Sequence, residues 1–480
     1  MRKALVPVVL LATCCTFAAF ATRGVAAPPP AVAGAAPLPF PVAIHATKMQ
    51  LHNGLEAIYE EDHRTPIVTV NVWYHVGSKD EAPGKNGFAH LFEHMMFQGS
   101  KHVPEDTYFK NLEKVGGTSI NGTTTTDRTN YFETVPANRL ELALWLESDR
   151  MGFLLDHADE ATFKSQRDVV KNERRQNYEN APYGLVLEAL RAEQYPKEHP
   201  YHLLTIGTPQ DLDAATLEDV RAFFRTYYVP NNATLVVSGD FDRAKAEALV
   251  AKYFAPIARG RDVVRKTANP AAHPGEARIE LEAGVELARV IVSWLTPAMF
   301  APGDGELDLV SHVLAGSKTS RLYKRLVYDL QIAQSVSASQ QSSELGSTYE
   351  ITASARPGHT ADELLKVIDE ELVKLRQSGV DDAELSRAKT SIVADDIFAL
   401  ERSSSRADHL NVYNHYVGDP NFLARDVART TTPTAAAVTD MARKWLAEKD
   451  RVIAIVNPVK GAPIAGRVVK TSGAIRGGGT

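Results

Sequence analysis

Two histidines and a glutamate within residues 87–97 form the pattern that most clearly points to chemistry. His90 and His94 are four residues apart in a segment whose composition is typical of a helix, so their imidazoles share one face of that helix. Glu93 lies beside the same face. Two neutral imidazoles and a nearby carboxylate suit Zn²⁺ and leave one coordination position for water. The motif therefore predicts a zinc site.

The alternative is a helix whose histidines are structural and whose glutamate is solvated. The apolar residues around the motif make the segment apolar nearly all round, and they are Phe88, Leu91, Phe92, Met95 and Met96. A helix of this kind is expected to be buried. Because a buried imidazole needs a partner, and a metal ion provides one, we favour the zinc site.

A zinc site of this kind needs a third protein ligand. Both cysteines, Cys14 and Cys15, lie in an N-terminal segment that we expect to be removed, so the mature chain would offer no thiolate. A helix predicted over 161–178 can bring a carboxylate to the ion from a second element. Composition alone does not choose among the acidic candidates, which are Asp149, Asp168, Glu173 and Glu179.

The N-terminal residues 1–21 predict a secretory signal peptide. Arg2 and Lys3 precede an apolar stretch that ends in small residues at 19–21. We therefore expect export, most naturally to a periplasm, and the alternative is a membrane anchor formed by the uncleaved segment. Residues 22–43 are rich in Ala and Pro and predict an extended linker. No later stretch is long and apolar enough to predict a transmembrane helix.

Beyond residue 43, the sequence predicts two domains of similar length and element order, which suggests an internal duplication. We expect the first domain over 44–257 and the second over 277–470. The charged residues and the Pro and Gly residues of 258–276 predict the linker between them, and the tail 471–480 is expected to be disordered. A net charge of −6 without basic blocks gives no reason to expect a nucleic-acid partner.

Hydrophobic periodicity and turn residues predict the individual elements. Besides the motif helix, the first domain is expected to contain strands at 47–59, 67–76, 118–134 (with a turn near 121–122 or 127–128) and 233–238, and helices at 106–115, 140–149, 161–178, 185–194, 216–228 and 243–254. The second is expected to contain strands at 277–281, 289–294, 335–355 and 451–457, and helices at 305–315, 320–330, 360–379, 434–447 and in the residues up to 416.

The motif and a second short pattern downstream resemble the insulinase/pitrilysin family of zinc peptidases, also called inverzincins. The second pattern is Val169-Val170-x-x-Glu173, and the resemblance is strongest to the shorter members, which include mitochondrial processing peptidase and bacterial periplasmic two-chain peptidases. It extends to His199-Pro200-Tyr201, Ile206-Gly207, Leu212, Phe223, Tyr227-Tyr228, Pro230, Asn232 and 237–240. It implies that His90, His94 and Glu173 bind one Zn²⁺ per chain and that Glu93 is the general base.

The resemblance also implies an α+β fold with two similar domains. Each domain would be a mainly antiparallel sheet with helices packed on one face, and the two domains would face each other across a cavity. The strand that follows Gly116-Gly117 would be an edge strand that pairs with the substrate backbone, through residues Thr118, Ser119, Ile120 and Asn121. The alternative is that this segment is only a polar strand.

The second half departs from the family pattern. Many active members carry an Arg and a Tyr there that hold the substrate, but this sequence has Val327 and Gln334 at those positions. Val has no hydrogen-bond donor, and Gln lacks a phenol that could stabilise an oxyanion. Either Arg325 or Tyr328 substitutes in a shifted register, or a related partner subunit supplies the pair. Gln166 stands where the family often has an additional Glu.

Three functions are compatible with these patterns. The first is a zinc-dependent endopeptidase that hydrolyses peptides or unfolded segments, as the zinc-bearing subunit of a two-chain complex. The second is a non-catalytic peptide-binding or structural subunit of the same fold, which the intact motif argues against. The third is a zinc hydrolase on an unrelated fold, which the extent of the matches argues against. The remaining histidines are expected to be structural or exposed, among them His75, His102, His157 and His202.

Overall fold

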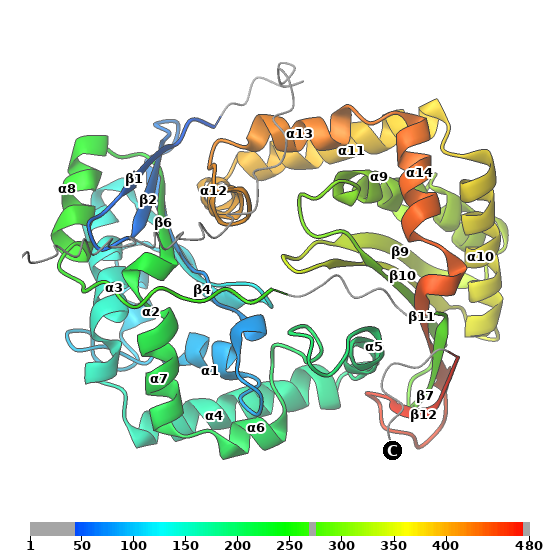
Figure 1. Ribbon diagram of the computed structural model, residues 1–480, viewed down its shortest axis with the longest axis horizontal. Helices are drawn as coiled ribbons and strands as arrows, with labels where there is room; N and C mark the ends of the chain where they lie inside the picture. Colours follow the sequence, from blue (N-terminus) through cyan, green and yellow to red (C-terminus); the bar gives the residue numbers. More distant parts are fainter. Residues whose placement is uncertain (1–43, 268–274, 474–480) are drawn as a thin grey trace, which may run out of the picture. The chain divides into compact units, whose positions relative to one another are not determined.

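The computed structural model describes residues 44–267 and 275–473 (Figure 1). The predicted signal peptide and the Ala/Pro-rich linker after it lie outside the described residues, as do 268–274 of the predicted interdomain linker and 474–480 of the tail.

The first half contains one sheet with the strand order β1-β2-β6-β3-β5-β4, in which only the β2–β6 pair is parallel. Its strands are β1 (Thr47–Gln50), β2 (Glu56–Glu61), β3 (Ile67–Tyr74), β4 (Thr118–Thr124), β5 (Thr129–Pro136) and β6 (Ala233–Gly239). Its helices are α1 (Phe88–Met95), α2 (Tyr108–Glu113), α3 (Leu140–Phe153), α4 (Glu160–Arg174), α5 (Val186–Gln194), α6 (Pro209–Ala214), α7 (Leu217–Tyr227) and α8 (Arg243–Phe254).

The second half contains a sheet with the order β12-β7-β11-β8-β10-β9, in which only the β7–β11 pair is parallel. Its strands are β7 (Ala277–Ala283), β8 (Arg289–Thr296), β9 (Ala333–Gln341), β10 (Ser347–Ala355), β11 (Arg451–Pro458) and β12 (Arg467–Gly473). Its helices are α9 (Asp304–Ala315), α10 (Ala361–Ser378), α11 (Asp382–Leu400), α12 (Ser403–Val417), α13 (Leu423–Thr431) and α14 (Ala435–Trp445).

The two sheets have the same order when β2, β6, β3, β5 and β4 are matched with β7, β11, β8, β10 and β9. Only the outer strand at one edge differs: β1 comes before the other strands of its sheet in the sequence, whereas β12 comes after the other strands of its sheet. This agreement in topology supports the internal duplication, and it confirms the predicted α+β fold with two similar, mainly antiparallel domains.

Each half covers one face of its own sheet with its own helices, as predicted. The alternation of side chains along the strands explains this, since successive residues point to opposite faces. In β6, Leu235 and Val237 join the core that contains α1, α3 and α8, whereas Val236 faces the other way.

The other face of each sheet is covered by a helix from the opposite half. α12 contacts β6 and β3, where its Leu410 packs with Ile58 and Val236. α5 contacts β11 and β7, where its Leu190 packs with apolar side chains of both strands. The two helices lie beside these strands in Figure 1. The halves are therefore joined by two helices, each of which packs on the sheet of the opposite half.

Several element boundaries differ from the sequence-based expectation. The predicted strand 47–59 is a hairpin, because residues 51–55 form a hydrogen-bonded turn between β1 and β2. The short helix α6 and the strand β12 were not predicted, and β12 continues beyond the expected domain end at 470. The turn of the 118–134 segment lies at 125–128.

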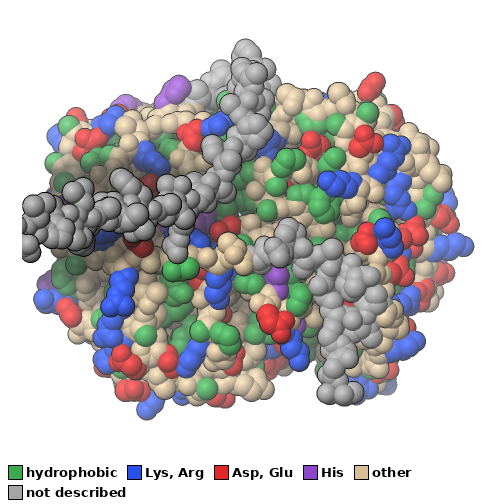
Figure 2. All heavy atoms as spheres, viewed as in Figure 1, with side chains coloured by type: hydrophobic (Ala, Val, Ile, Leu, Met, Phe, Trp, Pro, Cys, Tyr) green, Lys and Arg blue, Asp and Glu red, His purple; other side chains and the backbone are tan. Residues whose placement is uncertain are grey.

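The surface carries charges of both signs. On the face drawn in Figure 2, Lys and Arg side chains alternate with Asp and Glu side chains rather than gathering by sign. No helix within 44–267 or 275–473 has both the length and the apolar character needed to cross a membrane.

Candidate metal centre

The motif helix α1 is held at its N-terminus by a buried carboxylate. The helix begins after Gly87, whose φ of 95° is a left-handed conformation that favours glycine. The Glu81 side chain accepts hydrogen bonds from the backbone N–H groups of Gly87 (3.0 Å) and Ala89 (2.8 Å), both at the start of the helix. Glu81 therefore satisfies donors that have no partner within the helix and fixes the position from which His90 and His94 project.

The side chains of His90, His94 and Glu173 converge. Nε2 of His90 is 3.6 Å from Oε2 of Glu173, and Nε2 of His94 is 3.4 Å from the same oxygen. Two ligand atoms that each lie about 2.1 Å from a tetrahedral zinc are about 3.4 Å apart. Within the described residues this is the only group of three or more His, Cys, Asp or Glu side chains arranged to hold a metal ion. Its nitrogen and oxygen donors fit Zn²⁺.

The environment favours the neutral imidazole that metal binding requires. Burial, with a smaller contribution from His94, lowers the pKa of His90 to about 4. The two imidazoles are each 17% exposed and Glu173 is 34% exposed, so the group can be reached from solvent.

Glu173 lies near the end of α4, which packs beside α1. α4 begins at the cap Asp159, whose side chain accepts from Thr162 N–H (2.8 Å), and it buries Phe163 and Val170 on the side of the core. The next residue, Arg174, donates to the carbonyl of Gly207 (2.8 Å) and so fixes the helix end.

Glu93 lies in α1 beside this group and faces the strand β4. Its Oε2 accepts a 2.6 Å hydrogen bond from the Thr124 hydroxyl. Burial outweighs that hydrogen bond and raises the pKa of Glu93 to about 7. A Cβ at Gly122 would be 3.1 Å from Cγ of Glu93, so a glycine in β4 allows the carboxylate to approach the strand closely. A carboxyl group with a pKa near neutrality can both take up and release a proton.

β4 is the last strand of its sheet and has a free edge. Thr125 N–H donates to the Arg128 carbonyl (2.9 Å) at the turn, and hydrogen-bonded pairs alternate along an antiparallel ladder. The main-chain groups of Gly122 and Thr124 therefore point away from β5. The free part of the edge beside Glu93 is thus 122–124.

The predicted substrate-binding residues lie at the other end of β4. The register shifts between Thr118 and Asn121, and Ser119 has a φ of 51°. Ile120 packs against the first core. The structure thus brings Gly122 and Thr124 closest to Glu93, whereas the predicted substrate-binding residues were 118–121.

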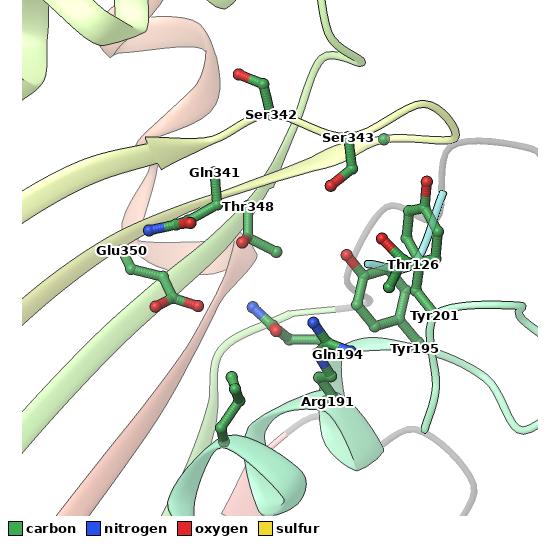
Figure 3. A pocket seen from close by; sticks show the side chains of 12 residues that line it. Thr126, Arg191, Gln194, Tyr195, Tyr201, Gln341, Ser342, Ser343, Thr348 and Glu350 are labelled. Atoms are coloured by element: carbon green, nitrogen blue, oxygen red, sulfur yellow. The ribbon is translucent and has the colours of Figure 1, made fainter. Parts of the chain in front are cut away.

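Beyond the end of β4 lies a polar cavity of about 280 Å³ between α5 and the β9–β10 hairpin. Figure 3 shows Arg191, Gln194 and Tyr195 of the first half opposite Gln341 and Glu350 of the second. Both halves therefore line the space next to the free edge.

The other acidic candidates are engaged elsewhere or exposed. Asp149 accepts from Nδ1 of His102 (2.5 Å) and from the Ser100 hydroxyl, and Glu179 pairs with Arg174 (3.2 Å). Asp168 is exposed on α4, and Gln166 is buried there.

The other histidines that sequence analysis set aside lie outside the metal group. His75 contacts the Thr234 hydroxyl (3.0 Å), His102 contacts Asp149, and His202 contacts the Tyr195 carbonyl (2.8 Å).

The second-half residues considered as substitutes do not form an Arg/Tyr pair near the metal group. Arg325 lies 3.8 Å from Glu370 of α10, and Tyr328 is 73% exposed. Val327 packs against the second core and Gln334 is exposed on β9.

Comparison with known families gives two adjoining matches. Residues 56–207 match the insulinase family (peptidase family M16), and residues 214–392 match the peptidase M16 inactive domain. The first match contains the metal group and the second contains the start of the other half.

Individual relatives agree with these matches. The chain is 31% identical to the zinc protease PqqE of Helicobacter pylori over 74% of this chain and 80% of the relative. It is 24% identical to a probable mitochondrial-processing peptidase subunit beta of Arabidopsis thaliana, over 86% of this chain and 78% of the relative. The crystal structure of a protease from Helicobacter pylori superposes with a TM-score of 0.81 at 28% identity, covering 86% of this chain and all of that chain.

Proposed function

Because the chain belongs to peptidase family M16, we propose that it is a zinc-dependent endopeptidase that hydrolyses peptides or unfolded segments. The observation that carries this proposal is the convergence of His90, His94 and Glu173, with Glu93 beside them and hydrogen-bonded to the Thr124 side chain of the strand that has a free edge.

His90, His94 and Glu173 would hold the zinc ion. When bound, Zn²⁺ supplies Lewis acidity that polarises the scissile carbonyl and lowers the pKa of a water molecule. Glu93 takes a proton from that water and delivers it to the nitrogen of the leaving amine. The Thr124 hydroxyl holds the Glu93 carboxylate in place during both transfers.

The free edge of β4 binds the substrate as an added strand. The outward main-chain groups of Gly122 and Thr124 pair with the peptide backbone, as in β-augmentation, so a peptide can be held without recognition of its side chains. The edge residues 118–121 extend this surface, although the irregular backbone at Ser119 limits regular pairing there.

A related subunit completes the active complex. Val327 and Gln334 cannot hold a substrate as an Arg and a Tyr would, and Arg325 faces α10 instead. A relative named as a subunit of a processing peptidase supports a two-chain arrangement. The predicted signal peptide supports a location of this complex outside the cytoplasm, in a periplasm.

Metal analysis and a peptide assay test the proposal. We expect about one zinc ion per purified chain, and cleavage of an internally quenched peptide that a chelator abolishes and zinc restores. Cleavage should rise when a related subunit is added. A chain that binds zinc but cleaves no peptide with any such subunit would instead support the non-catalytic peptide-binding role.

A further inference from the structure

Two turns from opposite halves meet at the end of β4. The β9–β10 turn contacts the β4–β5 turn: Glu344 N–H donates to Oδ2 of Asp127 (3.0 Å), and Leu345 N–H donates to the hydroxyl of Tyr201 (2.9 Å). The Tyr201 hydroxyl donates in turn to Oδ1 of Asp127 (2.5 Å). The second half thus binds directly to the turn that follows the free edge.

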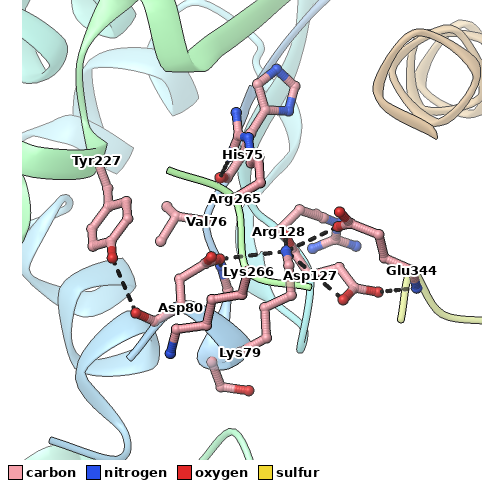
Figure 4. A network of polar contacts seen from close by, with 12 residues as sticks. His75, Val76, Lys79, Asp80, Asp127, Arg128, Tyr227, Arg265, Lys266 and Glu344 are labelled. Carbon is pink, nitrogen blue, oxygen red and sulfur yellow. Dashed lines mark hydrogen bonds and ion pairs between the residues drawn. The ribbon is translucent and has the colours of Figure 1, made fainter. Parts of the chain in front are cut away.

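A buried lysine lies at the centre of this contact, as Figure 4 shows. Lys79 is 1% exposed, and its Nζ lies 3.0 Å from Oε2 of Glu344 and 3.4 Å from Oδ2 of Asp80. It also donates to the main-chain carbonyl of Asp127 (2.9 Å). A buried cation is tolerated only where anions compensate its desolvation. Among the carboxylates of the described residues within 4 Å of Nζ, only that of Glu344 comes from the second half.

Glu344 carries a negative charge in this environment. Burial alone would raise its pKa, but His415 and Lys79 outweigh burial and lower the pKa of Glu344 to about 2. Nε2 of His415 lies 3.6 Å from the carboxylate, and the His415 ring stacks on His75 with centroids 4.5 Å apart.

The lysine segment and the β4–β5 turn form one hydrogen-bonded unit. Ser78 N–H donates to the Thr125 carbonyl (3.1 Å), and Lys79 N–H donates to the Thr126 carbonyl (2.9 Å). The same loop contains Glu81, which caps α1. A shift of the turn would therefore move Thr124 on one side of Glu93 and the start of α1 on the other.

From these contacts we propose that Glu344 is a positioning residue of the first-half active site. Glu344 holds the β4–β5 turn through its contacts with Lys79 and Asp127. The position of this turn then determines where Thr124 meets Glu93 and where the free edge of β4 lies. This inference rests on the proposed peptidase function. Because a misplacement of about 1 Å can reduce a rate about 100-fold, a residue far from the metal group in the sequence can act on kcat.

The test is Glu344→Gln, with Glu370→Gln on α10 as the matched control from the same half. We expect kcat for a quenched peptide to fall at least tenfold in Glu344→Gln, while zinc content and melting temperature stay near those of the unaltered chain. Glu370→Gln should stay within twofold. In a Lys79→Met background, Glu344→Gln should cause no further loss, because Glu344 acts through Lys79.

Hydrogen exchange provides a readout that does not depend on catalysis. In Glu344→Gln, amide exchange over 118–128 should accelerate at least fivefold, while exchange over β8 stays unchanged. An unchanged kcat and unchanged exchange would overturn the inference, and so would a loss of kcat that follows a loss of zinc. If the unaltered chain cleaves no peptide even with a related subunit but exchange responds as expected, the proposed function fails, while the role of Glu344 in holding the β4–β5 turn stands.

Discussion

The two halves of the molecule share one framework and differ in what they place on it. α1 and α9 both begin after a glycine in the left-handed region, Gly87 and Gly303. Counted from these residues, His90 corresponds to Glu306 and His94 to Val310. The second half therefore has the helix of the metal group without its imidazoles.

The helix that carries Glu173, the proposed third ligand, shows the same relation. α4 and α11 are capped by Asp159 and Asp381, and each cap accepts a hydrogen bond from the third residue of its helix. Counted from the caps, Glu173 corresponds to Asp395. The second half thus has a carboxylate at the position of Glu173 but no imidazoles. The comparison shows that both helix pairs offer the same backbone positions, and that a few side chains decide whether a metal ion can bind there.

The largest effect is expected at Glu93, the proposed general base. Glu93→Gln should lower kcat about 1,000-fold, since general acid–base catalysis contributes about that much. Zinc content should remain unchanged. The control is Leu309→Met at the corresponding position of α9, which should keep kcat within twofold. Peptide turnover and metal analysis measure both, and an unaltered turnover in Glu93→Gln would remove Glu93 from the mechanism.

The two helices that pack on the sheet of the opposite half, α5 and α12, should contribute similar amounts to the free energy of unfolding. Leu410→Ala in α12 and Leu190→Ala in α5 each remove a buried side chain from the sheet of the opposite half, so each should lower the free energy of unfolding by about 3 kcal/mol. Urea denaturation measures the loss, with Leu330→Ala at an exposed position as the control. A large loss of stability in only one of the two variants would show that the two helices do not stabilise the contact between the halves equally.

The carboxylates of α4 and α11 should differ in metal binding. Glu173→Gln should weaken zinc affinity at least about 100-fold, because loss of a direct ligand exceeds the effect of losing its outer partners. Asp395→Asn should leave the affinity unchanged. Competition with a chromophoric chelator measures both constants. Equal effects in the two variants would mean that the metal does not bind where the three side chains converge.

The last prediction concerns pH and the second half. Burial, with Asp304 nearby, raises the pKa of Asp308 in α9 to about 8, so the folded chain keeps a proton that the unfolded chain releases near pH 4. Stability should therefore fall as pH rises from about 4 to about 8. Asp308→Asn removes this dependence and should be more stable than the unaltered chain at pH 8, with little difference at pH 4.

Melting curves at the two pH values test this prediction. Phe92 of α1, which corresponds to Asp308, carries no titratable group, so a Phe92→Leu variant should keep the pH dependence of the unaltered chain. A stability difference between Asp308→Asn and the unaltered chain that is larger at pH 4 than at pH 8 would contradict the sign.

Much of the framework was predictable because local patterns determine it. The spacing of His90 and His94 predicted one helix face, and apolar and β-branched content predicted strands such as 67–76, which the structure shows as β3. The third ligand was chosen among four acidic residues only through the family resemblance. The geometry now favours Glu173 because its carboxylate alone among the four joins both imidazoles.

What could not be predicted depends on contacts between distant residues. No local sequence pattern indicates that Gly122 lies close to Glu93 or that Glu344 pairs with Lys79. The same holds for α12, whose composition gave no indication that it would pack on the sheet of the other half. The segment 47–59 was predicted as one strand because the turn that divides it, at 51–55, is short.

The reciprocal placement of α5 and α12 constrains the order of events during synthesis. The first sheet is complete once β6 has emerged, yet the apolar face formed by Ile58 and Val236 stays uncovered until residues 403–417 have been made. Until then the first half exposes this apolar face to solvent, and transiently exposed apolar surface is prone to aggregation.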